Sequence, residues 1–75
     1  MSKIEAKADV TGSVWKIVAA VGAPLEAGDT IMILESMKME IPVLAEDGGT
    51  LLELTVAEGD AVREGQVVAV LGDGR

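Results

Sequence analysis

Apolar residues recur in short runs along this chain, and the runs repeat at an offset of 37 residues. The segment from Gly12 to Glu35 aligns without a gap with the segment from Gly49 to Gly72. Three glycines of the first copy match glycines of the second, and most positions between them keep their apolar or polar character. Chance rarely aligns several glycines together with the pattern between them. The alignment therefore predicts two copies of one structural unit.

Each copy predicts strands that are separated by glycine turns. A β-like run (13–21, then 50–57) is followed by two turns and by a short apolar strand (30–34, then 67–71). Glycines at this density mark turns and leave little room for helices. Strands separated by turns about every ten residues are typical of a small sandwich or barrel. Because each copy is too small to enclose a core, we expect an all-β fold with two sheets packed face to face.

The first run of each copy breaks the strict alternation of a strand. Val14 and Ile17 are three positions apart, and their counterparts in the second copy have the same spacing. A β-bulge is needed if both residues of such a pair are to point inward. On this interpretation, Trp15 and Leu52 lie at least partly at the surface.

The connection between the two copies contains Lys38, in the sequence Glu-Ser-Met-Lys-Met-Glu. Residues 29–41 include no glycine or proline and place apolar residues at helical spacing, so this stretch could also form a capped helix. The second copy favours strands, because the matching run at 67–71 is rich in β-branched residues. We therefore predict a strand, a hairpin and a second strand, with Lys38 at the tip. Pro42 is expected at a sheet edge or a bend just beyond the hairpin.

Composition excludes several kinds of chemistry. The 75 residues, which we expect to form one domain over 1–75, contain no cysteine, histidine, phenylalanine or tyrosine. Disulfides, thiolate metal sites and the usual general base are therefore absent, and the core must be aliphatic. We expect no catalytic residues and no metal site.

Charge and hydropathy bear on the partners and the location. Thirteen acidic residues against six basic ones give a formal net charge of −7. Binding to nucleic acid or to an anionic membrane requires clustered Lys and Arg, so neither is an expected partner. No apolar stretch is long enough to span a bilayer, and we expect a cytoplasmic protein.

The segment Glu35-Ser36-Met37-Lys38-Met39 resembles the biotin-attachment motif of biotin carboxyl carrier proteins, in which a lysine lies between two methionines. The resemblance extends from about Asp9 to Leu71 and includes the Gly-Asp turns and the duplication. It implies a flattened barrel of two four-stranded antiparallel sheets, related by the internal quasi-twofold repeat. It also implies that the acceptor lysine lies on an exposed hairpin far from both termini.

This resemblance implies a carrier and not an enzyme. A biotin protein ligase would activate biotin as an acyl adenylate, and the amine of Lys38 would attack it. Biotin on Lys38 would then carry a carboxyl group, as carboxybiotin, from a biotin carboxylase to a carboxyltransferase. Partners would recognise Met37 and Met39, although both methionines could instead belong to the core. Glu35 and Glu40 are either solvated charges or ligase contacts.

Three alternatives remain. The first is a lipoyl-carrying domain or a domain that accepts both biotin and lipoate, which shares the implied fold. The lysine of a lipoyl domain usually follows an aspartate and precedes a small residue, so the methionines beside Lys38 favour biotin over lipoate. An unmodified interaction module would leave Lys38 unchanged under all conditions. An enzyme is the weakest alternative, because no triad, metal set or phosphate loop can be drawn. We expect a natural single-domain carrier that is monomeric in isolation.

Overall fold

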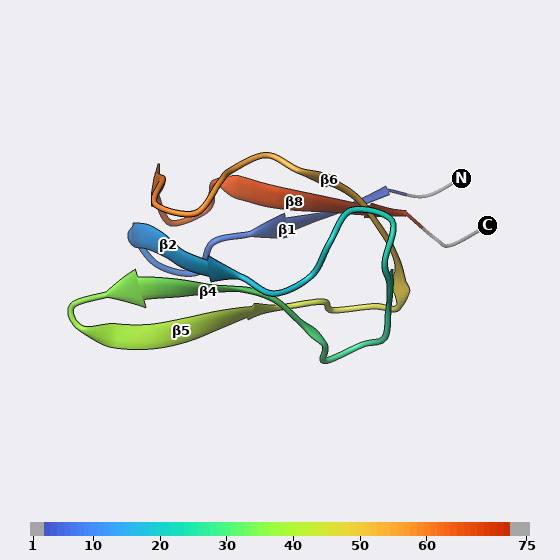
Figure 1. Ribbon diagram of the computed structural model, residues 1–75, viewed down its shortest axis with the longest axis horizontal. Coiled ribbons are helices and arrows are strands. Elements are labelled where there is room, and N and C mark those ends of the chain that lie inside the picture. The colour runs from blue at the N-terminus through green and yellow to red at the C-terminus, as the bar shows by residue number, and fades with distance from the viewer. Residues whose placement is uncertain (1–2, 73–75) are drawn as a thin grey trace.

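The computed structural model describes residues 3–72, and these residues form eight strands (Figure 1). In chain order the strands are β1 (Lys3–Lys7), β2 (Gly12–Ile17), β3 (Pro24–Leu25), β4 (Thr30–Ser36), β5 (Met39–Leu44), β6 (Gly49–Leu54), β7 (Ala61–Val62) and β8 (Val67–Gly72). The described residues contain no helix, and so none that is long and apolar enough to cross a membrane. The predicted all-β fold is confirmed, and the alternative helix over residues 29–41 is wrong.

The strands form two antiparallel four-stranded sheets, with the orders β1-β8-β6-β3 and β5-β4-β2-β7. The offset of 37 residues maps β1 to β4 onto β5 to β8, and this exchange converts one sheet order into the other. The predicted quasi-twofold repeat is therefore confirmed. The two copies are also intertwined, because β2 pairs with β7 and β3 pairs with β6.

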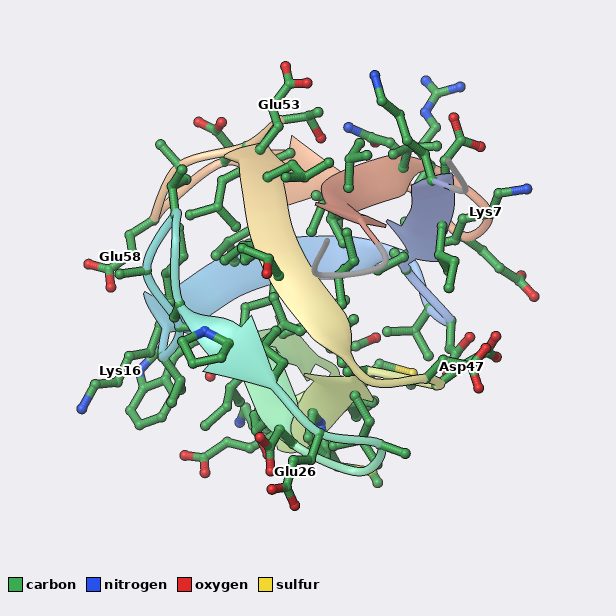
Figure 2. The ribbon with its side chains drawn as sticks, turned by 90° about the vertical axis from the view of Figure 1, so that its right-hand side faces the viewer. Lys7, Lys16, Glu26, Asp47, Glu53 and Glu58 are labelled. Carbon is green, nitrogen blue, oxygen red and sulfur yellow. The ribbon has the colours of Figure 1, made fainter. Side chains whose placement is uncertain are left out.

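An aliphatic core lies between the two sheets. Among residues 3–72, no polar or charged residue is buried, and Figure 2 shows the labelled charged side chains pointing away from the barrel. Removal of apolar surface from water is the main favourable contribution to folding, so this core holds the sheets together. Its buried residues are Ala8, Val14, Ile31, Met32, Leu34, Val43, Ala45, Leu51, Val62, Val68, Ala69 and Leu71.

Both predicted bulges are present. The strand pairing shifts its register just after Val14 in β2 and just after Leu51 in β6. These two residues are buried, and the residues three positions after them pack against the core. Trp15 and Leu52, which occupy the bulges, are 49% and 44% exposed. The prediction that they lie partly outside is confirmed.

The first strand of each copy is shorter than predicted. We expected extended runs over residues 13–21 and 50–57, but β2 and β6 each end after six residues. The chain then leaves one sheet for the other, and the N–H of Gly22 donates to the carbonyl of Leu51 in β6 at 2.7 Å. These crossings lead into β3 and β7, which are too short to produce a pattern in the sequence.

The first strand, β1, was not predicted, because the aligned repeat begins at Gly12. It extends the duplication, since β1 matches β5 at the same offset and pairs with β8 as β5 pairs with β4. Within residues 3–72, β4 and β5 are the only consecutive strands that pair with each other, and a two-residue turn joins them. That turn lies at one end of the 37 Å long axis, whereas β1 begins and β8 ends at the other (Figure 1).

Candidate functional site

Lys38 lies at the tip of the β4–β5 hairpin, as predicted. β4 ends at Ser36 and β5 begins at Met39, so Met37 and Lys38 alone form the loop. Their φ angles are 53° and 65°, and no other non-glycine residue between 3 and 72 has a positive φ. Two successive positive φ angles define the type I′ turn, whose twist matches that of the flanking strands.

The residues in this turn are not those that favour its conformation. Type I′ turns usually contain Asn, Asp or Gly, and other residues pay roughly 1–2 kcal/mol in the left-handed region. Burial does not compensate, because Met37 is 92% exposed and Lys38 is also exposed. Met39, the first residue of β5, is 62% exposed, so the alternative that the two methionines belong to the core is wrong. Strain at an exposed site indicates a role other than the stability of the free domain.

Two glutamates face each other directly below the turn. Glu35 in β4 pairs with Glu40 in β5, and both side chains are exposed. Like charges at directly opposed positions destabilise a pair of strands. The next pair towards the tip is Ser36 with Met39, and the hydroxyl of Ser36 donates to the carbonyl of Thr11 at 2.9 Å. This hydrogen bond joins the end of β4, next to the turn, to the segment before β2.

Gly12, which follows Thr11, lies against the same end of the hairpin. A Cβ atom at this position would collide with the backbone carbonyl of Glu35 and would lie 3.2 Å from the Cβ of Ser36. The first residue of β2 therefore passes so close to the end of β4 that a side chain does not fit. The sequence marked Gly12 only as a repeat position, and nothing in the pattern predicted this contact with the hairpin.

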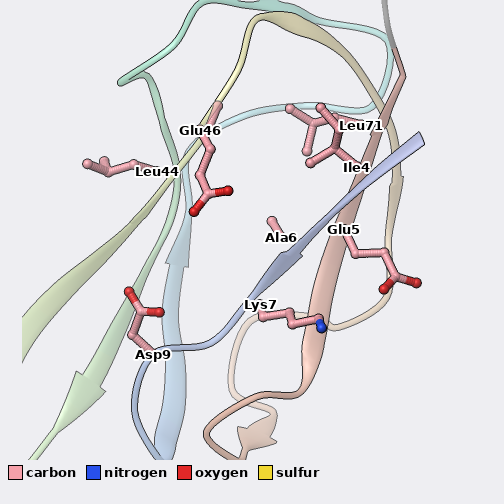
Figure 3. Close-up of a pocket in the computed structure, with 9 residues that line it drawn as sticks. Ile4, Glu5, Ala6, Lys7, Asp9, Leu44, Glu46 and Leu71 are labelled. Carbon is pink, nitrogen blue, oxygen red and sulfur yellow. The ribbon is translucent and has the colours of Figure 1, made fainter. Parts of the chain in front are cut away.

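A cavity of about 350 Å³ lies at the seam between β1 and the end of β5, apart from the hairpin tip (Figure 3). In this view Glu46 and Asp9 lie on one side of β1, and Glu5 and Lys7 lie on the other. Within residues 3–72 there is no cluster of three or more His, Cys, Asp or Glu that could hold a metal ion. The residues that line the cavity are Ile4, Glu5, Ala6, Lys7, Asp9, Leu44, Ala45, Glu46 and Leu71.

Known proteins share both the sequence and the fold. The sequence model of a biotin/lipoyl family, described as "Biotin-requiring enzyme", matches residues 4–71. A "Biotinylated protein TB7.3 homolog" from Mycobacterium leprae is 39% identical over 67 residues, which are 89% of this chain and 94% of that protein. A "Biotin/lipoyl attachment protein" from Bacillus subtilis is 42% identical over 64 residues, or 85% of this chain and 88% of that protein.

A solved structure shows the same arrangement of strands. Part of the urea carboxylase of Kluyveromyces lactis superposes with a TM-score of 0.91 at 39% identity, covering 96% of this chain and 6% of the carboxylase chain. The family match begins at Ile4, so it includes nearly all of β1. The resemblance seen in the sequence, from about Asp9 to Leu71, does not reach this strand. Because the match extends to Leu71 in β8, it spans the whole barrel. The chain belongs to the biotin/lipoyl attachment domain family.

Proposed function

We propose that this domain is a non-catalytic biotin carrier and that Lys38 is the residue to which biotin is attached. The observation that supports this most is the position of Lys38, exposed in a left-handed turn at one end of the molecule. A lysine that serves only solubility has no need of two strained residues. Two small relatives whose names refer to biotin, from M. leprae and B. subtilis, cover nearly the same length.

Attachment would form an amide on the side chain of Lys38. The neutral amine attacks the acyl carbon of biotinyl adenylate held by a biotin protein ligase. A C–N bond forms, the bond between the acyl carbon and the phosphate oxygen breaks, and AMP leaves, while the proton of the amine passes to the ligase or to water. Because the turn holds Lys38 beyond the last strand pair, Ser36 with Met39, neither sheet obstructs this attack.

Attached biotin supplies a ring nitrogen that can hold a carboxyl group. The residues of this chain position the biotin. The hairpin places the biotinylated side chain of Lys38 at one end of the barrel, and the strained turn sets the direction in which that side chain leaves the backbone. A flexible tether raises the effective concentration of its end group at each partner site. We therefore propose a biotin carboxylase and a carboxyltransferase as the later partners.

Intact mass after incubation with a biotin protein ligase, ATP and biotin tests this proposal. Wild type should gain the mass of one amide-linked biotin, and Lys38→Arg should gain nothing. Lys16→Arg, which changes an exposed lysine of β2, is the matched control and should be modified like wild type. Modification of Lys38→Arg to the same extent would show that another residue accepts the biotin.

Lipoylation is a second candidate function, because the relative from B. subtilis is named for both biotin and lipoyl attachment. A parallel incubation with a lipoate ligase, ATP and lipoate separates the two. We expect biotin to be attached faster, because Lys38 lies between two methionines. Attachment of lipoate alone would exclude the biotin assignment but keep Lys38 as the acceptor, and the absence of both would favour an unmodified interaction module.

A further inference from the structure

The internal repeat provides a comparison within the molecule, because matched positions share one fold and only one sheet carries Lys38. On the outer face of the sheet that contains the hairpin, Ile33 in β4 lies between Pro42 in β5 and Lys16 in β2. At the matched positions of the other sheet, Val70 lies between two acidic residues, Glu5 and Glu53.

These rows face away from the core. Met32 and Leu34 are fully buried, so Ile33 between them points to the outer face, as alternation along a strand requires. Figure 2 shows Lys16 and its counterpart Glu53 pointing away from the barrel on different sides. One sheet therefore presents isoleucine between proline and lysine where the other presents valine between two carboxylates.

The two bulge residues expose similar fractions, 49% for Trp15 and 44% for Leu52, but Trp15 is the larger side chain. Leu52 is folded over its own sheet, since a Cβ atom added at Gly72 would lie 2.9 Å from the side chain of Leu52. The position that matches Gly72 is Glu35, so the hairpin sheet has a charged side chain where the other sheet has none. Trp15 nevertheless leaves about half of its large surface exposed.

We define the hairpin face as the outer surface formed by Trp15, Ile33, Glu35, Glu40 and Pro42. It combines the exposed Trp15 and Pro42 and the half-buried Ile33 with two opposed carboxylates. Exposed apolar surface and opposed like charges are both unfavourable for the free domain. At the positions that match Glu35 and Glu40, the other sheet has no pair of like charges. A partner could cover the hairpin face with apolar surface and place cationic groups opposite the carboxylates. Such a partner would remove the apolar side chains from water and offset the repulsion between the two carboxylates.

We propose that the hairpin face is the docking surface for the ligase that acylates Lys38, an inference that rests on the proposed function. Lysine has only a four-carbon stem, so an enzyme that acts on its amine must come close to the hairpin backbone and touch the strands beside it. Partners that act on the end of an attached biotin reach it across a longer arm. The ligase therefore has the greater need of a docking surface next to the turn.

The docking surface can be tested by replacing residues with those at the matched positions of the other copy. These replacements carry little risk to folding, because the same residues already occur in the same fold. The variants are Trp15→Leu and Pro42→Glu, which introduce the residues found at positions 52 and 5. We expect each to lower kcat/KM for biotinylation by about tenfold, mainly through KM, because apolar anchors dominate binding energy at interfaces. The matched control, Leu52→Ala on the other sheet, should keep the kcat/KM of wild type. Unchanged thermal midpoints confirm that the variants are folded.

Each outcome separates this inference from the function on which it rests. Wild-type rates for both Trp15→Leu and Pro42→Glu would overturn the docking surface and leave Lys38 as the acceptor. An equal loss in Leu52→Ala would overturn it too, because the effect would not be specific to the hairpin face. Normal biotinylation of Trp15→Leu, followed by poor carboxylation of its biotin, would overturn docking of the ligase. It would show instead that a later partner binds the hairpin face. An unmodified wild type would overturn the function itself.

Discussion

Met37 adopts a backbone conformation that a glycine would adopt at lower free energy. Its φ of 53° lies in the left-handed region, and its side chain has almost no burial to offset the strain. Lys38 is also in the left-handed region, with a φ of 65°, and is strained in the same way. A turn selected for stability alone would place Asn or Gly at these two positions. The residues present instead set the direction in which the side chain of Lys38 leaves the backbone at the end of the barrel.

Replacing Met37 with glycine should therefore stabilise the domain. We expect Met37→Gly to raise the free energy of unfolding by about 1 kcal/mol, because a glycine avoids the left-handed strain. The measurement is urea unfolding followed by circular dichroism. Met39→Gly is the control: Met39 is also exposed but lies in a strand, where glycine lowers stability by roughly 0.5–1 kcal/mol. A loss of stability in Met37→Gly would show that the turn is not strained.

The hairpin depends on β2 as much as on its own two strands. Gly12 allows the backbone of β2 to approach the end of β4, and the Ser36 hydroxyl bonds to the carbonyl of Thr11. The tip is thereby held by a strand that is distant in the sequence. This contact connects the second strand of the fold to the direction in which Lys38 points.

Adding one methyl group at Gly12 should disturb the hairpin. A Cβ atom there meets the backbone carbonyl of Glu35, which cannot move aside as a flexible side chain could. We expect Gly12→Ala to lower the free energy of unfolding by about 1–3 kcal/mol and to slow biotinylation of Lys38. Ser13→Ala, one residue further along β2, is the control and should change stability by less than about 0.5 kcal/mol. Equal stability of the two variants would mean that β2 does not constrain the hairpin.

The sequence predicted the elements that the repeat contains in duplicate. The first hairpin strand and both bulges could be inferred, because glycines and apolar spacing recur in two copies. The edge position of Pro42 in β5 followed from the missing N–H of proline. β1 was missed, since the aligned repeat starts after it. β3 and β7 are only two residues long and carry no periodicity. The contact of Gly12 with Glu35 depends on how β2 and β4 meet in space, which no pattern along the chain encodes.

At the scale of the whole molecule, the two copies share both sheets and one core, so we expect them to unfold as one cooperative unit. Each sheet contains strands from both copies, and the core is shared between the sheets. The ends of β1 and β8 lie opposite the hairpin, so further chain can be joined there without obstructing Lys38 (Figure 1). The match to 6% of the K. lactis urea carboxylase chain is an example of this fold within a much larger protein.

Cooperativity can be tested with the single tryptophan, which reports on the first copy. Leu34 in the first copy and Leu71 in the second are matched, buried residues. We expect Leu34→Ala and Leu71→Ala each to cost about 2–5 kcal/mol and to lower the midpoint of Trp15 fluorescence in urea by similar amounts. A normal Trp15 transition in Leu71→Ala would show that the copies unfold independently.

The proposed carrier function depends most on which of the four lysines in the chain receives biotin. The most direct measurement is peptide mass spectrometry of the wild-type domain after reaction with a biotin protein ligase, ATP and biotin. We predict that the mass of biotin is found on Lys38 alone. Biotin on Lys3, Lys7 or Lys16, or on no residue, would contradict the assignment.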